Sequence, residues 1–328
     1  MFLRAKTTNS GMGSGINLHN TFVMTGKIAA SGSIMYLLKS DGDLDTIPSD
    51  YCFVRLFRDC SSLTQAPELP ATTLAGNCYL YMFQNCTSLT TAPELPATTL
   101  ASSCYVNMFR DCSSLTQAPE LPATTLASSC YDSMFANCTS LTNAPELPAT
   151  TLATYCYSSM FDNCTSLTTA PKLPATTLAE RCYRSMFQSC SSLTTAPNLP
   201  ATTLAEYCYS TMFANCTSLT QAPKLPATTL ASCCYDSMFQ NCTSLTQSPE
   251  LPATTLASNC YRSMFQNCSS LNSIKIAYTG NFSGTGVPTN AFNGWVNGVA
   301  ASGTLYYNGN DTTTGASAIP TNWTIQTF

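Results

Sequence analysis

Residues Cys78–Ser103 read CYLYMFQNCTSLTTAPELPATTLASS, and this stretch returns every 26 residues with few positions changed. Two series of cysteines mark the period, the second eight residues after the first. The first is Cys52, Cys78, Cys104, Cys130, Cys156, Cys182, Cys208, Cys234 and Cys260, and the second runs in the same steps from Cys60 to Cys268. A fixed period of about 20–50 residues is typical of a solenoid, in which each unit buries its apolar face against its neighbours.

The first nine residues of each repeat follow the pattern C-Y-x-x-M-F-x-x-C. On a helix with about 100° per residue, the five apolar positions fall within one arc of about 140°. The four other positions lie outside this arc and differ between repeats; in the second repeat they are Leu80, Tyr81, Gln84 and Asn85. The pattern predicts a helix of about two turns with one buried stripe and one variable, solvent-facing side.

The rest of each repeat reads T/S-S-L-T-x-A-P-x-L-P and then A-T-T-L-A. Two prolines three residues apart exclude a long hydrogen-bonded strand. We therefore expect a very short parallel strand at Leu-Thr-x-Ala, extended chain through Pro-x-Leu-Pro, and a turn back to the next unit with Leu100 and its equivalents pointing inward.

The core M-F-x-x-C-T-S-L followed by L-P resembles the BspA-like leucine-rich repeats, whose signature is A-F-x-x-C-x-x-L with a following I-P. The resemblance covers about residues 51–271 and extends less specifically to the tail, with A-F-N-G-W-V-N-G-V-A-A-S-G-T and I-P-T-N-W-T-I. The period of 26 residues is longer than the usual unit of that family. The resemblance implies an α/β repeat solenoid, a leucine-rich-repeat-like right-handed coil. BspA-like proteins act as bacterial surface adhesins, and similar repeats occur in phage structural proteins.

We predict four parts along the chain. Residues 1–20 form a flexible leader, or alternatively an arm that attaches the solenoid to something else. Residues 21–50 form a β-rich N-terminal cap. Residues 51–271 form the solenoid, about nine repeats with the last partial. Residues 272–328 form a β-rich C-terminal cap, whose two tryptophans are expected to plug the last coil rather than to bind sugar.

Composition excludes several classes of function. The chain of 328 residues is 9% charged and 44% hydrophobic, with a net charge of −4 and a pI near 4.9. An acidic balance without Lys/Arg clusters argues against nucleic acid and anionic membrane as partners. No run approaches the roughly 18 apolar residues of a membrane span. Met1–Thr21 lacks the apolar run of about 7–15 residues that a signal peptide needs. We expect an extracellular or virion-surface protein without a signal peptide in this chain.

Nineteen cysteines raise the question of disulfides or metal. Two cysteines eight apart on a helix are separated by about 12 Å, beyond the roughly 7 Å limit between the Cα atoms of a disulfide. We therefore expect two ladders of reduced, buried thiols. Zinc is not expected, because C-x-x-C is absent and the single histidine, His19, lies outside the repeats. Cys233 occupies a variable position and is expected to be exposed and reactive.

Catalysis finds no support, since one histidine outside the array gives no Ser–His or Cys–His pair; we expect no enzyme and no cofactor. One column of carboxylates stands out: Glu68, Glu94, Glu120 and Glu146. On adjacent parallel strands about 4.8 Å apart, these groups would either repel one another or hold a hard cation such as calcium. The same column continues as Lys172, Asn198, Lys224 and Glu250, which favours an ordinary solvated column.

Two further patterns match known functional motifs, N-glycosylation and ice binding, but support them only weakly. Asn-Cys-Thr matches the N-glycosylation pattern at Asn85, Asn137, Asn163, Asn215 and Asn241, which we interpret as a by-product of the repeat. Columns of threonine suggest ice binding, but the T-x-A-P pattern lacks the flat T-x-T array of such surfaces.

The remaining candidate site is a column of varied polar residues beside the Glu/Lys column. Its members are Gln65, Thr91, Gln117, Asn143, Thr169, Thr195, Gln221 and Gln247. Solenoids commonly use such extended faces for recognition. We predict non-catalytic recognition or adhesion, with a host or microbial surface protein or glycan bound by this column together with Glu68, Glu94, Glu120 and Glu146. The alternative is a structural spacer or a filament or fibre subunit that self-assembles and has no ligand face.

Overall fold

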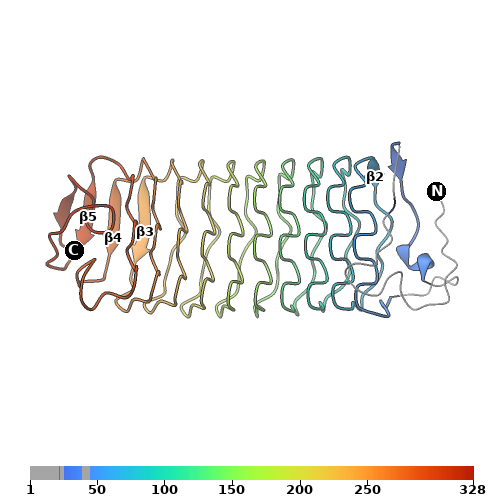
Figure 1. Cartoon of the computed structure of the whole chain (residues 1–328), viewed down its shortest axis with the longest axis horizontal. Helices are drawn as coiled ribbons and strands as arrows, with labels where there is room; N and C mark the ends of the chain where they lie inside the picture. Colours follow the sequence, from blue (N-terminus) through green and yellow to red (C-terminus); the bar gives the residue numbers. More distant parts are fainter. Residues whose placement is uncertain (1–21, 23–25, 39–44) are drawn as a thin grey trace.

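The computed structural model describes residues 22, 26–38 and 45–328, which form one elongated array of stacked coils (Figure 1). Each coil corresponds to one repeat of the sequence. The predicted leader at residues 1–20 and His19 lie outside the described residues, as does part of the predicted N-terminal cap.

Regular elements are concentrated at the two ends of the array. They are β1 (Ile28–Ala29), the 3-10 helix η1 (Ile34–Leu37), β2 (Leu63–Gln65), β3 (Gln247–Leu251), β4 (Ser273–Ile276), β5 (Thr304–Tyr307) and β6 (Thr324–Gln326). β1 pairs with β2, and β3–β6 form a four-stranded sheet in sequence order. Every strand pair is parallel, and between β2 and β3 successive coils are joined by isolated parallel bridges. Parallel stacking of the repeats is thus confirmed.

The predicted helix is wrong. Across residues 45–328 the structure contains no α-helix, and the C-Y-x-x-M-F-x-x-C stretch is a chain of overlapping β-turns. We call residues 77–86, and their equivalents in other coils, the turn segment. Within it the N–H groups alternate between two acceptors. Those of Met82 and Gln84 bind the carbonyl three residues earlier, at 3.1 and 3.2 Å, whereas those of Phe83 and Asn85 bind carbonyls of the next coil, at 2.9 and 2.8 Å.

The turn segment needs a positive φ at every fourth residue. In the second repeat these residues are Asn77, Tyr81 and Asn85, with φ of 54°, 59° and 62°. Asparagine and aspartate tolerate this left-handed region better than other residues with a Cβ. They fill the last of the three columns in nearly every coil: Asp59, Asn85, Asp111, Asn137, Asn163, Asn215, Asn241 and Asn267, with Ser189 as the exception. The recurrent Asn is therefore a turn residue.

Two physical reasons explain why the turns replace the helix. The apolar residues recur as pairs four apart, such as Cys78–Tyr79 and Met82–Phe83, and nine residues are too few to separate a period of 4 from one of about 3.6. An isolated helix of this length is marginal, and Ser and Asn are poor helix formers. The turns bond every second N–H to a neighbouring coil, so each coil supplies backbone partners for the next.

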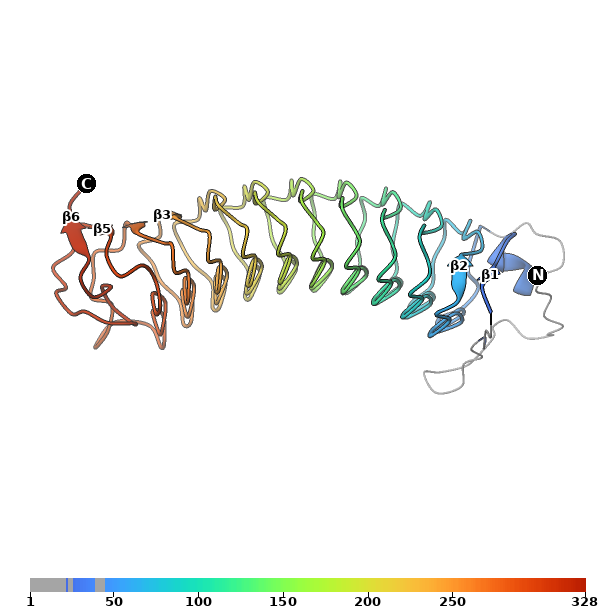
Figure 2. The ribbon, with the colours of Figure 1, turned by 90° about the horizontal axis from the view of Figure 1, so that it is seen from above.

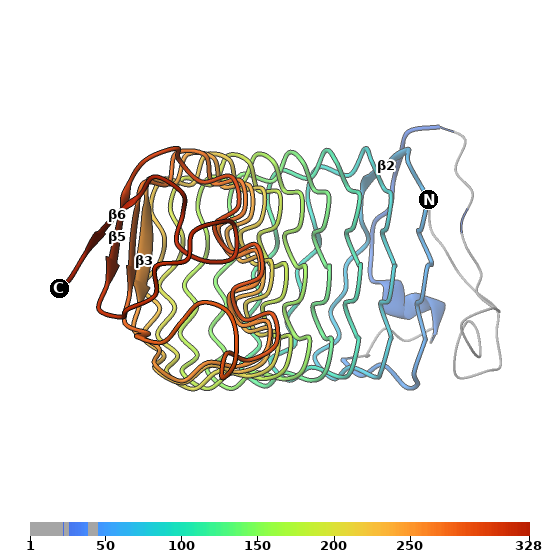
Figure 3. The ribbon, with the colours of Figure 1, turned by 60° about the vertical axis from the view of Figure 1, so that its left-hand side comes forward.

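Stacked side chains fill the interior of the array. Tyr79 lies over Tyr105 with ring centroids 5.8 Å apart, and Phe83 lies over Phe109 at 5.5 Å. These two aromatic rows continue through every coil and end on Phe292 and Trp295. The second cysteine of each repeat donates its S–H to the phenylalanine carbonyl of the preceding coil, as from Cys112 to Phe83 at 3.1 Å. Figure 3 shows the turn segments of successive coils in register, as these rows require.

The array is bowed, and the turn segments lie on its inner side (Figure 2). The outer, convex side carries the extended chain, which we call the strand face and define as residues 64–73 and their equivalents. Coil-to-coil hydrogen bonds are longer here: Thr116 N to Thr90 O and Thr142 N to Thr116 O are both 3.4 Å. The two prolines of each coil lack N–H groups for further bonds. Tight bonding on the turn side and weaker bonding on the strand face account for the bow.

Residues 291–298, in the predicted C-terminal cap, continue the same stacking. The N–H groups of Tyr261 and Phe265 bind the carbonyls of Ala291 and Trp295 at 3.0 and 2.8 Å. Gly294 and Gly298 take positive φ of 67° and 76° at positions where the repeats carry polar residues. Both tryptophans are buried, and each indole N–H donates to a backbone carbonyl at 2.8 Å. The tryptophans therefore pack against the last coils, as expected, and offer no exposed platform for sugar.

The turn segment yields a stability prediction at Asn137. Replacement by glycine keeps the positive φ and removes two side-chain hydrogen bonds, which costs about 1–3 kcal/mol. Replacement by valine also forces a β-branched residue to φ 62°, which adds about 1–3 kcal/mol. Urea unfolding followed by circular dichroism measures both losses. Equal destabilisation by Gly and Val would contradict the assigned backbone.

Candidate functional site

Every residue of the predicted binding columns is exposed on the strand face. The polar column coincides with the row of parallel bridges, in which Thr91 pairs with Gln117, Gln117 with Asn143, and Asn143 with Thr169. The bridges hold the members from Thr91 to Gln221 in register, whereas Gln65 and Gln247 pair with Ala29 and Ser273. The structure does not test whether the predicted residues bind a ligand.

The two columns flank a shallow groove at the N-terminal end of the strand face. The groove has a volume of about 490 Å³, and its polar lining comes from Gln65, Glu68, Thr91 and Glu94. Its floor and walls are apolar, made by Ala66, Pro67, Leu69, Pro70, Ala92, Pro93 and Pro96. A second groove of about 420 Å³ lies one coil further along, where Glu94 and Glu120 stand among four prolines or leucines and one alanine. Sequence analysis found the polar residues but not the groove, because the proline walls were assigned only a structural role.

The acidic column consists of Glu68, Glu94, Glu120 and Glu146, and these four side chains are exposed to solvent. Farther along the same column, Lys275 Nζ lies 2.7 Å from Glu250 Oε1. Among residues 22, 26–38 and 45–328, no group of three or more His, Cys, Asp or Glu side chains is arranged to hold a metal ion. The solvated column and the calcium alternative both stay predictions.

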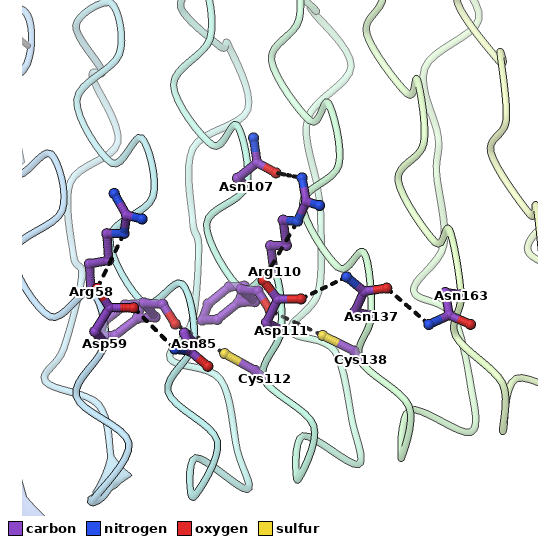
Figure 4. Close-up of polar contacts among 12 residues, drawn as sticks. Arg58, Asp59, Asn85, Asn107, Arg110, Asp111, Cys112, Asn137, Cys138 and Asn163 are labelled. Atoms are coloured by element: carbon purple, nitrogen blue, oxygen red, sulfur yellow. Dashed lines mark hydrogen bonds and ion pairs between the residues drawn. The ribbon is translucent and has the colours of Figure 1, made fainter.

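The asparagines of the N-C-T pattern form a ladder on the turn side. Asn137 Nδ2 donates to Asp111 Oδ1 at 2.6 Å, and Asn163 Nδ2 donates to Asn137 Oδ1 at 3.0 Å (Figure 4). A glycan attached to such an amide would displace a donor that the ladder uses. The interpretation of these sequons as a by-product of the repeat is consistent with this arrangement.

The arginines of the solenoid lie on the turn segments, a clustering that sequence analysis missed. Arg181 is placed between two tyrosines, with its guanidinium carbon 5.2 Å from the ring centroid of Tyr155 and 4.6 Å from that of Tyr207. Arg262 binds Asp236 through Nε at 3.0 Å and through Nη2. The cause of the omission was the false helix, which left the register of these columns undefined. Because these side chains already have partners, we assign them to coil stacking.

The cysteines are free and buried in the structure, all nineteen of them. The expectation that Cys233 is exposed is wrong: only 3% of its surface is accessible. Its sulfur lies 3.7 Å from the hydroxyl of Ser232. Hydrogen bonding with the Cys233 thiol, and the charge of that thiol, raise the pKa of Tyr207 above its ordinary value. Burial also raises the pKa of the ladder thiols, to about 12 for Cys112 and Cys216, with desolvation as the largest cause.

Comparison with known proteins identifies the family of the repeats. A family described as BspA type leucine rich repeat region matches six copies, at residues 49–194, 102–246 and 180–295. The chain belongs to the BspA-type leucine-rich repeat family. Among solved structures, a leucine rich cell surface protein from Faecalibacterium prausnitzii A2-165 is 17% identical, over 70% of this chain and 82% of that chain, with a TM-score of 0.22. No curated protein matches. Within the described residues, no helix has the length and apolarity to cross a membrane.

The thiol ladders predict that stability falls in alkali. Unfolded thiols ionise near pH 9, whereas folded Cys112 and Cys216 stay protonated until about pH 12. Between these values the unfolded state binds fewer protons, so the free energy of unfolding falls by up to about 1.4 kcal/mol per pH unit for each thiol. The contribution is complete below pH 9. We expect the melting temperature to drop from pH 8.5 to 11, and to drop less in a Cys112→Ala/Cys216→Ala variant when each protein is referred to its own value at pH 7. An equal drop in both proteins would contradict this assignment.

The redox state of the ladders gives a separate prediction. Protein unfolded without reductant and treated with an alkylating agent should add labels at most of its nineteen cysteines, as read by intact mass. Native protein should add few, because the thiols are buried and protonated. Labelling of fewer than about half of the cysteines after unfolding would mean that disulfides dominate.

Proposed function

We propose that this protein is a non-catalytic recognition module that binds a surface protein or glycan through its strand face. The observation that carries the proposal is the groove formed by Gln65, Glu68, Thr91 and Glu94 over a floor of alanine, leucine and proline. A concave apolar surface with a few convergent polar groups is the usual form of a binding site. Proline walls are rigid, so binding would order few groups and lose little entropy.

Variation between coils supports the same face. Core positions repeat almost letter for letter, whereas the polar column alternates among Gln, Thr and Asn along one exposed row. Such a row offers amide and hydroxyl groups, which donate and accept hydrogen bonds with sugars and with peptide backbones. Membership of the BspA-type family agrees with display at an extracellular or virion surface, which we include in the proposal.

The test is a variant in which Gln65, Thr91, Gln117 and Asn143 are all replaced by lysine. Many weak contacts over several coils should make the loss of binding graded. Each single replacement should weaken binding by less than about tenfold, and the variant with all four replacements by more than about a hundredfold. Binding is measured on a glycan array and to isolated surface proteins, together with a particle-association assay.

A matched control carries lysine at Ser61, Ser102, Thr217 and Thr243. These residues are exposed, lie outside the strand face and give the same change of charge. Equal binding by the parent and the first variant would place the ligand elsewhere. Absence of binding by every protein would favour the structural spacer.

A further inference from the structure

The Glu/Lys column is the single charged column of the strand face. Between the second cysteine of each repeat and the end of A-T-T-L-A, all positions outside this column carry uncharged residues in every repeat. The second prolines of the face add an exposed apolar ridge, formed most openly by Pro70, Pro122, Pro148, Pro174 and Pro226. A surface depleted of charge and rich in rigid apolar groups has the composition of an interface core.

When the columns of two copies are placed antiparallel, glutamates of one copy face lysines of the other. Along the chain it runs from four glutamates to lysine, asparagine, lysine and glutamate, and Lys275 follows Glu250 on the next strand. A two-fold axis between the coils of Glu146 and Lys172 opposes each position of one copy to a fixed position of the other. The opposed pairs are Glu146 with Lys172, Glu120 with Asn198, Glu94 with Lys224, and Glu68 with Glu250. Self-complementarity of one surface patch is the requirement for a closed two-fold dimer.

The like-charged outer pair fits the same arrangement. Glu250 is already neutralised by Lys275, whose Nζ lies 2.7 Å from its Oε1. The strand face is also the convex side of the array, so two copies placed face to face are closest near the middle and diverge toward the ends (Figure 2). Glu146 and Lys172 lie next to the axis, Glu94 and Lys224 lie two coils farther out, and Glu68 and Glu250 lie one coil beyond those.

We propose that a second copy of this chain binds the strand face, antiparallel to the first, through Glu94 and Glu146 of each copy and Lys172 and Lys224 of its partner. The interface consists of the proline ridge and the uncharged columns, and the four ion pairs set its register. This inference does not rest on the proposed recognition function, and along the middle coils a second copy and a ligand would compete for the strand face. The divergence of the two arrays leaves the coils of Gln65 and Glu68 at the margin of the interface.

The experiment uses two charge-reversed variants of the full chain. The first, Glu94→Lys/Glu146→Lys, makes all four opposed positions positive. The second, Lys172→Glu/Lys224→Glu, makes all four negative. Each variant alone should weaken the dimer by about tenfold or more, because like charges oppose one another. An equimolar mixture pairs opposite charges at all four positions and should restore a dimer that contains one copy of each variant.

Analytical ultracentrifugation at low and high salt, at protein concentrations up to about 100 μM, measures the association. Circular dichroism confirms that each variant is folded. A control variant, Glu180→Lys/Glu206→Lys, makes the same change of net charge outside the strand face and should dimerise like the parent.

Restoration of the dimer in the mixture, with weakened association of each variant alone, supports the proposal. A monomeric parent at about 100 μM overturns it. So do variants that dimerise as well as the parent, a mixture that stays monomeric, and a control that loses the dimer.

Discussion

The structure depends on the division of backbone N–H groups within the turn segment. Alternate groups bond inside a coil and across to the next coil, so no coil satisfies its own backbone alone. Because unpaired buried polar groups are costly, neighbouring coils must keep the same register along the whole array. The aromatic rows and thiol ladders follow from that register, since they place identical side chains one above another at ring spacings of about 5.4–6.0 Å.

The same division accounts for the shape and for where ligands have access. The turn side is tied by bonds such as Asn85 N to Arg110 O, at 2.8 Å, whereas the prolines of the strand face cannot contribute. Curvature therefore puts the extended chain outside and the turns inside (Figure 2). The turn side already uses its arginines and asparagines for contacts between coils. The strand face retains polar groups that remain exposed, and it has a groove.

The period, the parallel stacking and the exposed columns could be read from the sequence, because a repeat fixes which residues are neighbours between coils. The conformation of the turn segment could not. Cys78, Tyr79, Met82 and Phe83 occupy one arc under either period, and burial alone does not distinguish a helix from turns. The signal that was present was the recurring Asn or Asp before the second cysteine, which we assigned to chance. Cys233 was misplaced because its exposure was inferred from the variability of its position, and a variable position can be buried. The groove was missed because it forms only when the prolines of adjacent coils come together.

Near-identity of the coils has a consequence for how the gene for such a protein can change. Coil 104–129 presents to its neighbours almost the same surfaces as coil 130–155. Loss or duplication of one whole repeat would leave every junction chemically equivalent, so the array would lengthen or shorten without a defect in its interior. Unequal recombination between repeats is therefore structurally silent in the core. Its effect is confined to the exposed columns. The gain or loss of one repeat changes how far each polar or charged group lies from the ends of the array.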